Sequence, residues 1–80
     1  MPNLSKHRQS PALVALGSAI RRLRLAQNMS QEELSLAAEV ALSYVGRVER
    51  GDNNVALLTL QKIASALQIT LTELMAESEL

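Results

Sequence analysis

The stretch ALSYVGRVERG (residues 41–51) has two faces of opposite character when it is placed on a helix. With Val45 as reference and ~100° per residue, the nearby apolar side chains and Glu49 all fall within about 60° of it. The opposite face carries no apolar stripe and consists of Ser43, Arg47 and Arg50. A helix here therefore turns an acid toward the interior and two guanidinium groups toward solvent.

A charge of opposite sign lies on the core face of an upstream helix. With Ile20 as reference, Arg24 falls at about 40°, inside a stripe of leucines. An unpaired buried charge would be prohibitive, so we predict a salt bridge between Arg24 and Glu49 across the interior. The alternative is that the two side chains reach solvent independently.

The chain has helical periodicity and helix-start signals, and no strand pattern. Ser10, followed by a proline, is typical of a helix start. Ser30 with Glu33, and Thr70 with Glu73, have the spacing of capping boxes. We expect helices over residues 11–27, 31–38, 42–50, 57–67 and from 71 through about 75. The fold class is therefore all-α, a compact bundle of five short helices.

Length and composition limit how such a bundle is stabilised. Eighty residues suffice for one small domain, and without Cys, Trp or Phe its core must be aliphatic. We expect residues 1–9 to form a flexible N-terminal arm and residues 10–80 a single domain. Residues 6–20 superficially resemble a signal peptide, but their apolar residues keep helical spacing. No apolar run is long enough to span a bilayer, so we expect a cytoplasmic protein without a membrane partner.

The sequence lacks the residue patterns of most catalytic and ligand sites. His7 is the only histidine and cysteine is absent, so metal-ligand spacing is missing. There is no nucleophile–base pair, carboxylate dyad or glycine-rich phosphate loop. We expect no enzymatic activity, no cofactor, no metal and no small-molecule ligand.

The formal charge is zero, but it is unevenly distributed. Residues 1–31 hold five bases and no acid, giving +5, and residues 32–80 hold three bases and eight acids, giving −5. Zero net charge argues against a nucleic-acid partner, whereas the basic N-terminal part argues for one. The alternative is that the charges merely cover helices.

The polar face of residues 42–50 suits the major groove of DNA. Arg47 can donate two hydrogen bonds to guanine. We interpret Gly46, which costs ~1 kcal/mol inside a helix, as leaving room for another surface. Gln31 and free backbone N–H groups at the next helix start can meet phosphate, although Glu32 and Glu33 oppose an anion there. Further neutral donors are Tyr44, Asn53 and Asn54.

Residues 16–76 resemble the helix-turn-helix of the Cro and phage-repressor type, the Xre family. The residues that carry the resemblance are Ser30-Gln31-Glu32-Glu33-Leu34, Tyr44-Val45, Val48-Glu49-Arg50-Gly51, and Leu60 with Ile63-Ala64 and Leu67. The resemblance implies a lambda-repressor-like DNA-binding fold whose second and third helices form the motif, with the recognition helix beginning at Leu42. It implies base contacts by Leu42, Ser43 and Arg47. The DNA backbone contacts that we predict are Gln31, Tyr44, Arg50, Asn53 and Asn54.

The function predicted from these features is sequence-specific transcriptional regulation as a homodimer on a near-palindromic operator. Within the family, the chain resembles the small controller proteins of restriction–modification operons. The alternative is a protein-interaction module, such as an antitoxin or a helical adaptor. We predict a dimer interface of Leu58, Ile69, Leu71, Leu74 and Met75, with the alternative that Ile69 and Leu74 simply close the core.

Three features depart from the family pattern. Glu39 stands where Gly or Asn is usual, so either it avoids a left-handed conformation or strain is tolerated. Ala41 and Ala56 stand where Ser or Thr usually caps the next helix, which forfeits ~1 kcal/mol each unless Asn54 or water substitutes. Leu36 makes the outside of the second helix unusually apolar.

Overall fold

The computed structural model describes residues 9–79, and within this range it contains helices and no strand. The helices are α1 (Pro11–Ala26), α2 (Gln31–Ala38), α3 (Leu42–Glu49), α4 (Leu57–Ala66) and α5 (Leu71–Glu77). The all-α prediction is confirmed, and the observed helix ends lie within two residues of the predicted ones. The predicted N-terminal arm lies outside the described residues except for Gln9.

Local capping explains where three of the helices begin. The Ser10 hydroxyl accepts a hydrogen bond from the Leu13 N–H at the start of α1. Ser30 with Glu33 forms a complete capping box at α2, and Thr70 with Glu73 forms one at α5. These side chains satisfy N–H groups that a helix leaves free in its first turn. The three predicted starts are therefore confirmed.

The turn between α2 and α3 decides between the alternatives at Glu39. Its backbone is left-handed, with φ 60° and ψ 44°, so the strained conformation is present. Its N–H donates to the carbonyl oxygens of Ser35 and Leu36, which closes α2. Ala41 and Ala56 precede α3 and α4 without a side-chain cap hydrogen bond. These two helices therefore depend on packing more than α2 and α5 do.

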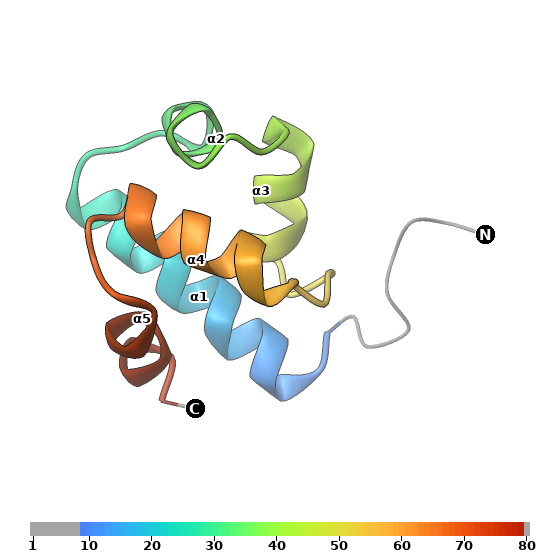
Figure 1. Cartoon of the computed structure of the whole chain (residues 1–80). Coiled ribbons are helices and arrows are strands. Elements are labelled where there is room, and N and C mark those ends of the chain that lie inside the picture. The colour runs from blue at the N-terminus through green and yellow to red at the C-terminus, as the bar shows by residue number, and fades with distance from the viewer. Residues whose placement is uncertain (1–8, 80) are drawn as a thin grey trace.

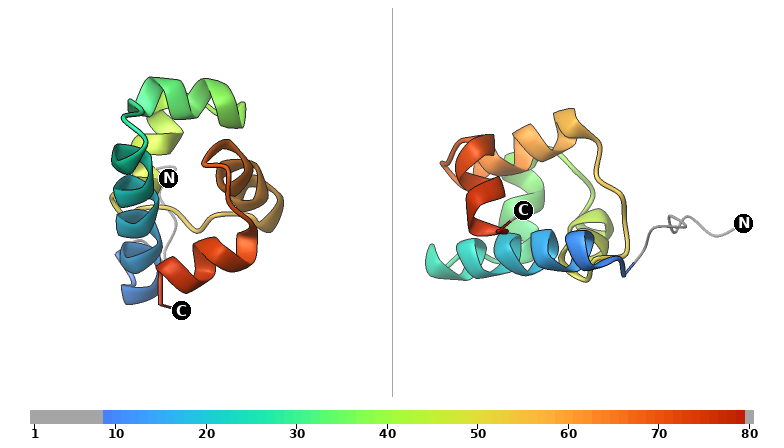
Figure 2. Two further views of the ribbon diagram at one scale, coloured as in Figure 1. Left: turned by 90° about the vertical axis from the view of Figure 1, so that its left-hand side faces the viewer. Right: turned by 90° about the horizontal axis from the view of Figure 1, so that it is seen from below.

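The described helices surround one aliphatic core. α1 and α4 lie on opposite sides of it, and α2 and α5 close its two ends (Figures 1 and 2). α3 packs against both α1 and α2. Every helix, together with the residue that follows α4, contributes to the core: Leu16, Ile20, Leu34, Ala38, Val45, Val48, Leu60, Ile63, Ala64, Leu67 and Leu74.

A glycine on α1 allows α3 to approach it closely. A Cβ atom on Gly17 would lie 2.3 Å from the carbonyl oxygen of Val48 and 2.7 Å from that of Glu49. Real side chains essentially never approach a backbone oxygen so closely, so only glycine fits this crossing. At Gly46, by contrast, a Cβ would meet Nη1 of Arg50 at 3.2 Å, the end of a flexible side chain. We expected Gly46 to leave room for the approach of another surface. In the structure, the side chain of Arg50 borders that space.

We predict that Gly17→Ala destabilises the protein by about 1–3 kcal/mol or more, because the added methyl group forces α1 away from the backbone of α3. Urea unfolding would measure the loss. Gly46→Ala is the matched control: Arg50 can move aside, and alanine favours the helix by up to ~1 kcal/mol, so stability stays equal or rises. Equal destabilisation by both substitutions would refute the conclusion that only glycine fits where α1 crosses α3.

Candidate nucleic-acid interface

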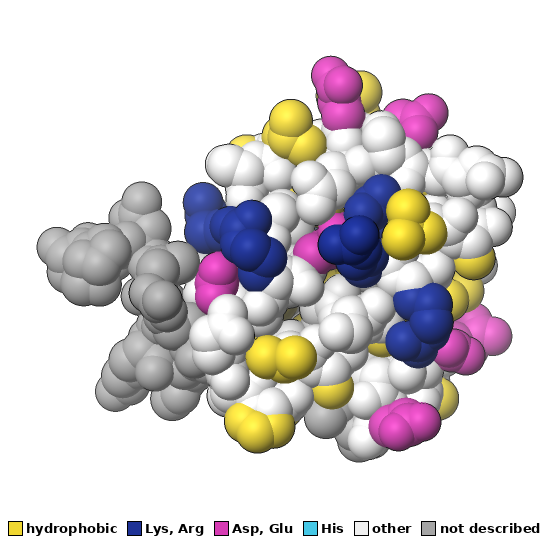
Figure 3. Space-filling model, turned by 180° about the vertical axis from the view of Figure 1, so that it is seen from behind, with side chains coloured by type: hydrophobic (Ala, Val, Ile, Leu, Met, Phe, Trp, Pro, Cys, Tyr) yellow, Lys and Arg dark blue, Asp and Glu magenta, His cyan; other side chains and the backbone are white. Residues whose placement is uncertain are grey.

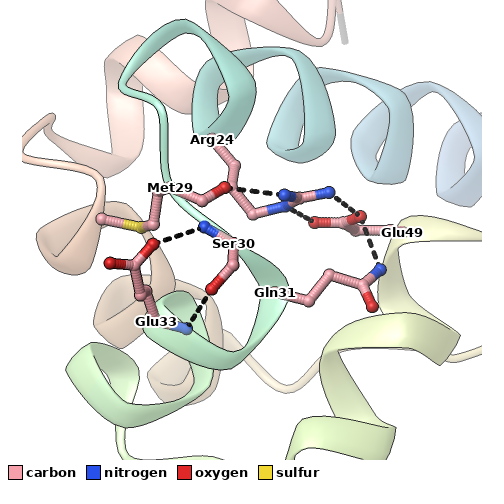
Figure 4. Close-up of polar contacts among 6 residues, drawn as sticks. All are labelled: Arg24, Met29, Ser30, Gln31, Glu33 and Glu49. Atoms are coloured by element: carbon pink, nitrogen blue, oxygen red, sulfur yellow. Dashed lines mark hydrogen bonds and ion pairs between the residues drawn. The ribbon is translucent and has the colours of Figure 1, made fainter.

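A buried ion pair joins α1 to α3. Nε of Arg24 lies 2.6 Å from Oε2 of Glu49, and Nη2 of Arg24 donates to Oε1 at 3.0 Å (Figure 4). The two side chains are only 8% and 3% exposed. The remaining terminal nitrogen of Arg24 donates to the carbonyl oxygen of Met29 at 2.7 Å. The structure thus contains the ion pair that helical periodicity predicts, and neither side chain reaches solvent independently.

Gln31 at the start of α2 connects this ion pair to the molecular surface. Its Nε2 donates to Oε1 of Glu49 at 3.0 Å, so the carboxylate accepts hydrogen bonds from three donor atoms on two helices. The amide oxygen of Gln31 is turned away from Glu49 (Figure 4). One of the two amide N–H groups is therefore used inside the protein, and the other can reach a ligand.

The outward face of α3 presents the side chains that the sequence assigns to base contacts. Leu42 is 50% exposed, and Ser43 is also exposed. Arg47 and Tyr44 are partly buried, and Cζ of Arg47 lies 5.7 Å from the centroid of the Tyr44 ring. Arg50 is exposed and pairs with Asp52, with Nε at 3.1 Å from Oδ2. The three predicted base-contacting residues therefore lie on one helix, while Val45 and Glu49 face the core.

The segment before α1 is joined to the loop that follows α3. Gln9 donates from Nε2 to the carbonyl oxygen of Arg50 at 3.0 Å and also to Oδ1 of Asp52. No local pattern in the sequence points to Gln9 or Asp52, because their contact spans more than forty residues. In the same loop, Asn53 is partly buried and Asn54 is exposed.

The acids at the start of α2 differ in where they point. The Glu33 carboxylate accepts the N–H of Ser30 at 2.7 Å, so it is engaged in the capping box (Figure 4). Glu32 is exposed. Basic side chains are distributed over the face seen in Figure 3, with acidic side chains beside them and at the margins. No continuous basic patch covers this face.

The predicted dimer-interface residues fall into three groups, which are buried, exposed and partly buried. Leu74 is completely buried in the core, so its assignment to the interface is corrected: it closes the bundle beneath α5. Leu58 is 72% exposed, and Leu57, which the sequence analysis did not select, is 63% exposed. Three further interface candidates are partly buried and pack against the core: Ile69, Leu71 and Met75.

No group of three or more histidine, aspartate or glutamate side chains in residues 9–79 could hold a metal ion. The same part of the chain has no helix of the length and apolarity that a bilayer crossing requires.

The chain is similar in sequence to a known protein family and to several named proteins. Residues 20–74 match the helix-turn-helix family model. The control protein C.BamHI of Bacillus amyloliquefaciens is 39% identical over 54 residues, which are 66% of this chain and 67% of that protein. The control protein C.MunI of a Mycoplasma species is 33% identical over 67 residues, 82% and 90% of the two chains.

A solved structure is similar in both sequence and fold. It is the restriction-modification controller protein C.AhdI from Aeromonas hydrophila, with 47% sequence identity and a TM-score of 0.76. The match covers 78% of this chain and 94% of that one.

We predict that breaking the buried ion pair is costly but non-additive. Arg24→Met and Glu49→Gln should each cost ~3–5 kcal/mol, because each strands a buried charge or polar group. The double variant should lose much less than the sum, which thermal and urea unfolding would measure.

The exposed pair between Arg22 and Glu77 is the control. Its side chains are 57% and 51% exposed, so Arg22→Met and Glu77→Gln should each cost below about 1 kcal/mol. Additive losses at Arg24 and Glu49 would mean that the two groups stabilise the fold separately.

Proposed function

This chain belongs to the helix-turn-helix family of the Xre type and is a DNA-binding transcriptional regulator; from that premise we propose that it binds a near-palindromic operator as a homodimer. We further propose that it controls a restriction–modification operon, since similar proteins are named as control proteins of this kind. Its site of action would be the cytoplasm. We propose no enzymatic activity, cofactor or small-molecule ligand for this protein.

The observation that carries the proposal is the two-sided character of α3. Glu49 is held inside by Arg24 and Gln31, and this fixes the rotation of α3 about its own axis. With that rotation, Ser43 and the exposed part of Leu42 face solvent. A short helix with one rigidly buried face and one free polar face fits the major groove.

The base-reading roles follow from the chemistry of the exposed groups. Leu42 would contact a thymine methyl group, and the Ser43 hydroxyl would either donate to a base edge or accept from it. Arg47, one turn further along α3, would donate two hydrogen bonds to a guanine. The first helical turn and the middle of α3 would thus read neighbouring base pairs.

The phosphate contacts would come from the rim around α3. The free amide N–H of Gln31 lies at the start of α2, where the helix dipole favours an anion. Arg50 would supply positive charge in addition to its contact with Asp52. Neutral donors would be Tyr44, Asn53 and Asn54.

A homodimer would place two copies of α3 in successive major grooves. The interface would be isologous, with half-sites about 34–36 Å apart. We propose Leu58 as its most exposed apolar residue. The partly buried residues beside it would be Ile69, Leu71 and Met75.

A protein-interaction module is the second candidate function, and one observation favours it. Leu36 on the outside of α2 is 73% exposed, more than any other large apolar side chain described. An adaptor or antitoxin would use such a residue to bind a protein partner.

Selection of bound sequences from a random DNA pool tests the proposed function. A homodimeric regulator should recover a near-palindrome with half-sites one helical turn, or a multiple of it, apart. Recovery of no common sequence would contradict the proposal and favour the interaction module.

We predict that Arg47→Ala leaves the melting temperature nearly unchanged, because the side chain is only partly buried and its Nε has no hydrogen-bond partner within residues 9–79. The variant should lose ~1–3 kcal/mol of discrimination at one base pair per half-site. Binding to the operator and to single-base variants, measured across salt concentrations, would report this. Equal weakening on every sequence, with the salt slope reduced by about one, would instead identify Arg47 as a phosphate contact.

We predict that Leu58→Glu shifts the protein toward monomer, because it places a charge in the apolar interface. Sedimentation at several concentrations would measure this. Leu36→Glu is the matched control, since Leu36 is 73% exposed and Leu58 72%. Unchanged self-association of the Leu58 variant would exclude Leu58 from the interface.

A further inference from the structure

Tyr44 and Arg47 contact each other on the outward side of α3. They are three residues apart, a spacing that brings side chains together on a helix surface. Cζ of Arg47 lies 5.7 Å from the Tyr44 ring centroid, within the ~6 Å at which a guanidinium is attracted to an aromatic face. Both residues are partly buried, so the contact is shielded on one side by the protein.

The two edges of the Arg47 guanidinium have different environments. Nε is buried and has no hydrogen-bond partner within residues 9–79. The terminal nitrogens Nη1 and Nη2 are not buried in this way, and they make no hydrogen bond in the same part of the chain. The guanidinium therefore has Nε against the protein, and its terminal nitrogens are more accessible than Nε.

We infer that Tyr44 is a positioning residue that orients Arg47 for base reading, and that Arg47 reads a guanine end-on through Nη1 and Nη2. This inference rests on the proposed function. A free arginine side chain has many rotamers and loses them on binding, which weakens the contact. An arginine already held against a ring loses fewer, so the contact with the base discriminates better.

Burial of Nε also restricts the geometry of the contact. A guanine presents two acceptors, N7 and O6, to the major groove. Arginine can meet them with two terminal nitrogens or with Nε and one terminal nitrogen, because all five of its N–H groups lie in one plane. With Nε turned into the protein, the first arrangement is the one that remains.

The ring and the hydroxyl of Tyr44 then have separate roles. The ring would orient Arg47 and so affect discrimination between sequences. The hydroxyl would donate to phosphate and so affect affinity on all sequences alike. Tyr44→Phe removes only the hydroxyl, whereas Tyr44→Leu removes both groups and keeps apolar bulk against the core.

The test is a double-mutant cycle of Tyr44 and Arg47, in which each variant is measured for its discrimination between two operator sequences. The measured quantity is the ratio of Kd values for the selected operator and for an operator in which the guanine read by Arg47 is replaced. Tyr44→Leu should lower this ratio about two- to fivefold, the effect of a cation–π contact near the surface. Tyr44→Phe should keep the ratio. In an Arg47→Ala background, Tyr44→Leu should change the ratio no further.

Proton NMR of the free protein provides a second readout that needs no DNA. The side-chain protons of Arg47 should show an upfield ring-current shift in the wild type and in Tyr44→Phe, and lose it in Tyr44→Leu. Thermal melts establish that each variant is folded, and Tyr44→Met replaces Tyr44→Leu if the latter unfolds.

Two results would overturn the inference. One is an equal effect of Tyr44→Leu on the Kd ratio in the presence and absence of Arg47. The other is a chemical shift of the Arg47 side-chain protons that does not depend on the Tyr44 ring. Wild-type protein that binds no DNA selectively would contradict the proposed function instead. The NMR result would then still report on the contact itself.

Discussion

The rotation of α3 about its own axis depends on the ion pair between Arg24 and Glu49. The carboxylate receives two donor atoms from Arg24 and a third from Gln31, so α1, α2 and α3 meet at one buried group. Replacing such a pair by apolar residues is often neutral for stability. The ion pair therefore contributes to the orientation of α3, because it allows only one face of this helix to turn outward.

This constraint matters because α3 has little stability of its own. It has eight residues and no side-chain cap at its start. Isolated helices shorter than about twelve residues are marginal in water, so α3 exists because its neighbours hold it. Gly17 lets α1 come close enough to do so, and the hydrogen bonds of Gln9 tie down the loop after α3. The helix proposed to read DNA is thus supported at its C-terminal end by contacts distant in sequence.

Features that depend on local chemistry or on the period of a single helix could be predicted from the sequence. Ser30 and Thr70 signal helix starts through residues three positions away, and the 3.6-residue period places Glu49 on the core face. Features that depend on how helices cross were not predictable. Gly17 is ordinary within α1 and becomes important only where α3 passes over it. Leu74 could close the core or form an interface, and only the packing of α5 decides.

At the crossing, Gly17 of α1 faces the main chain of α3, with the carbonyl groups of Val48 and Glu49 as its nearest neighbours. This contact between Gly17 and the main chain of α3 therefore does not depend on which side chains occupy the solvent face of α3. New outward residues could be transplanted onto α3 to recode its operator preference, while the scaffold underneath stays as it is.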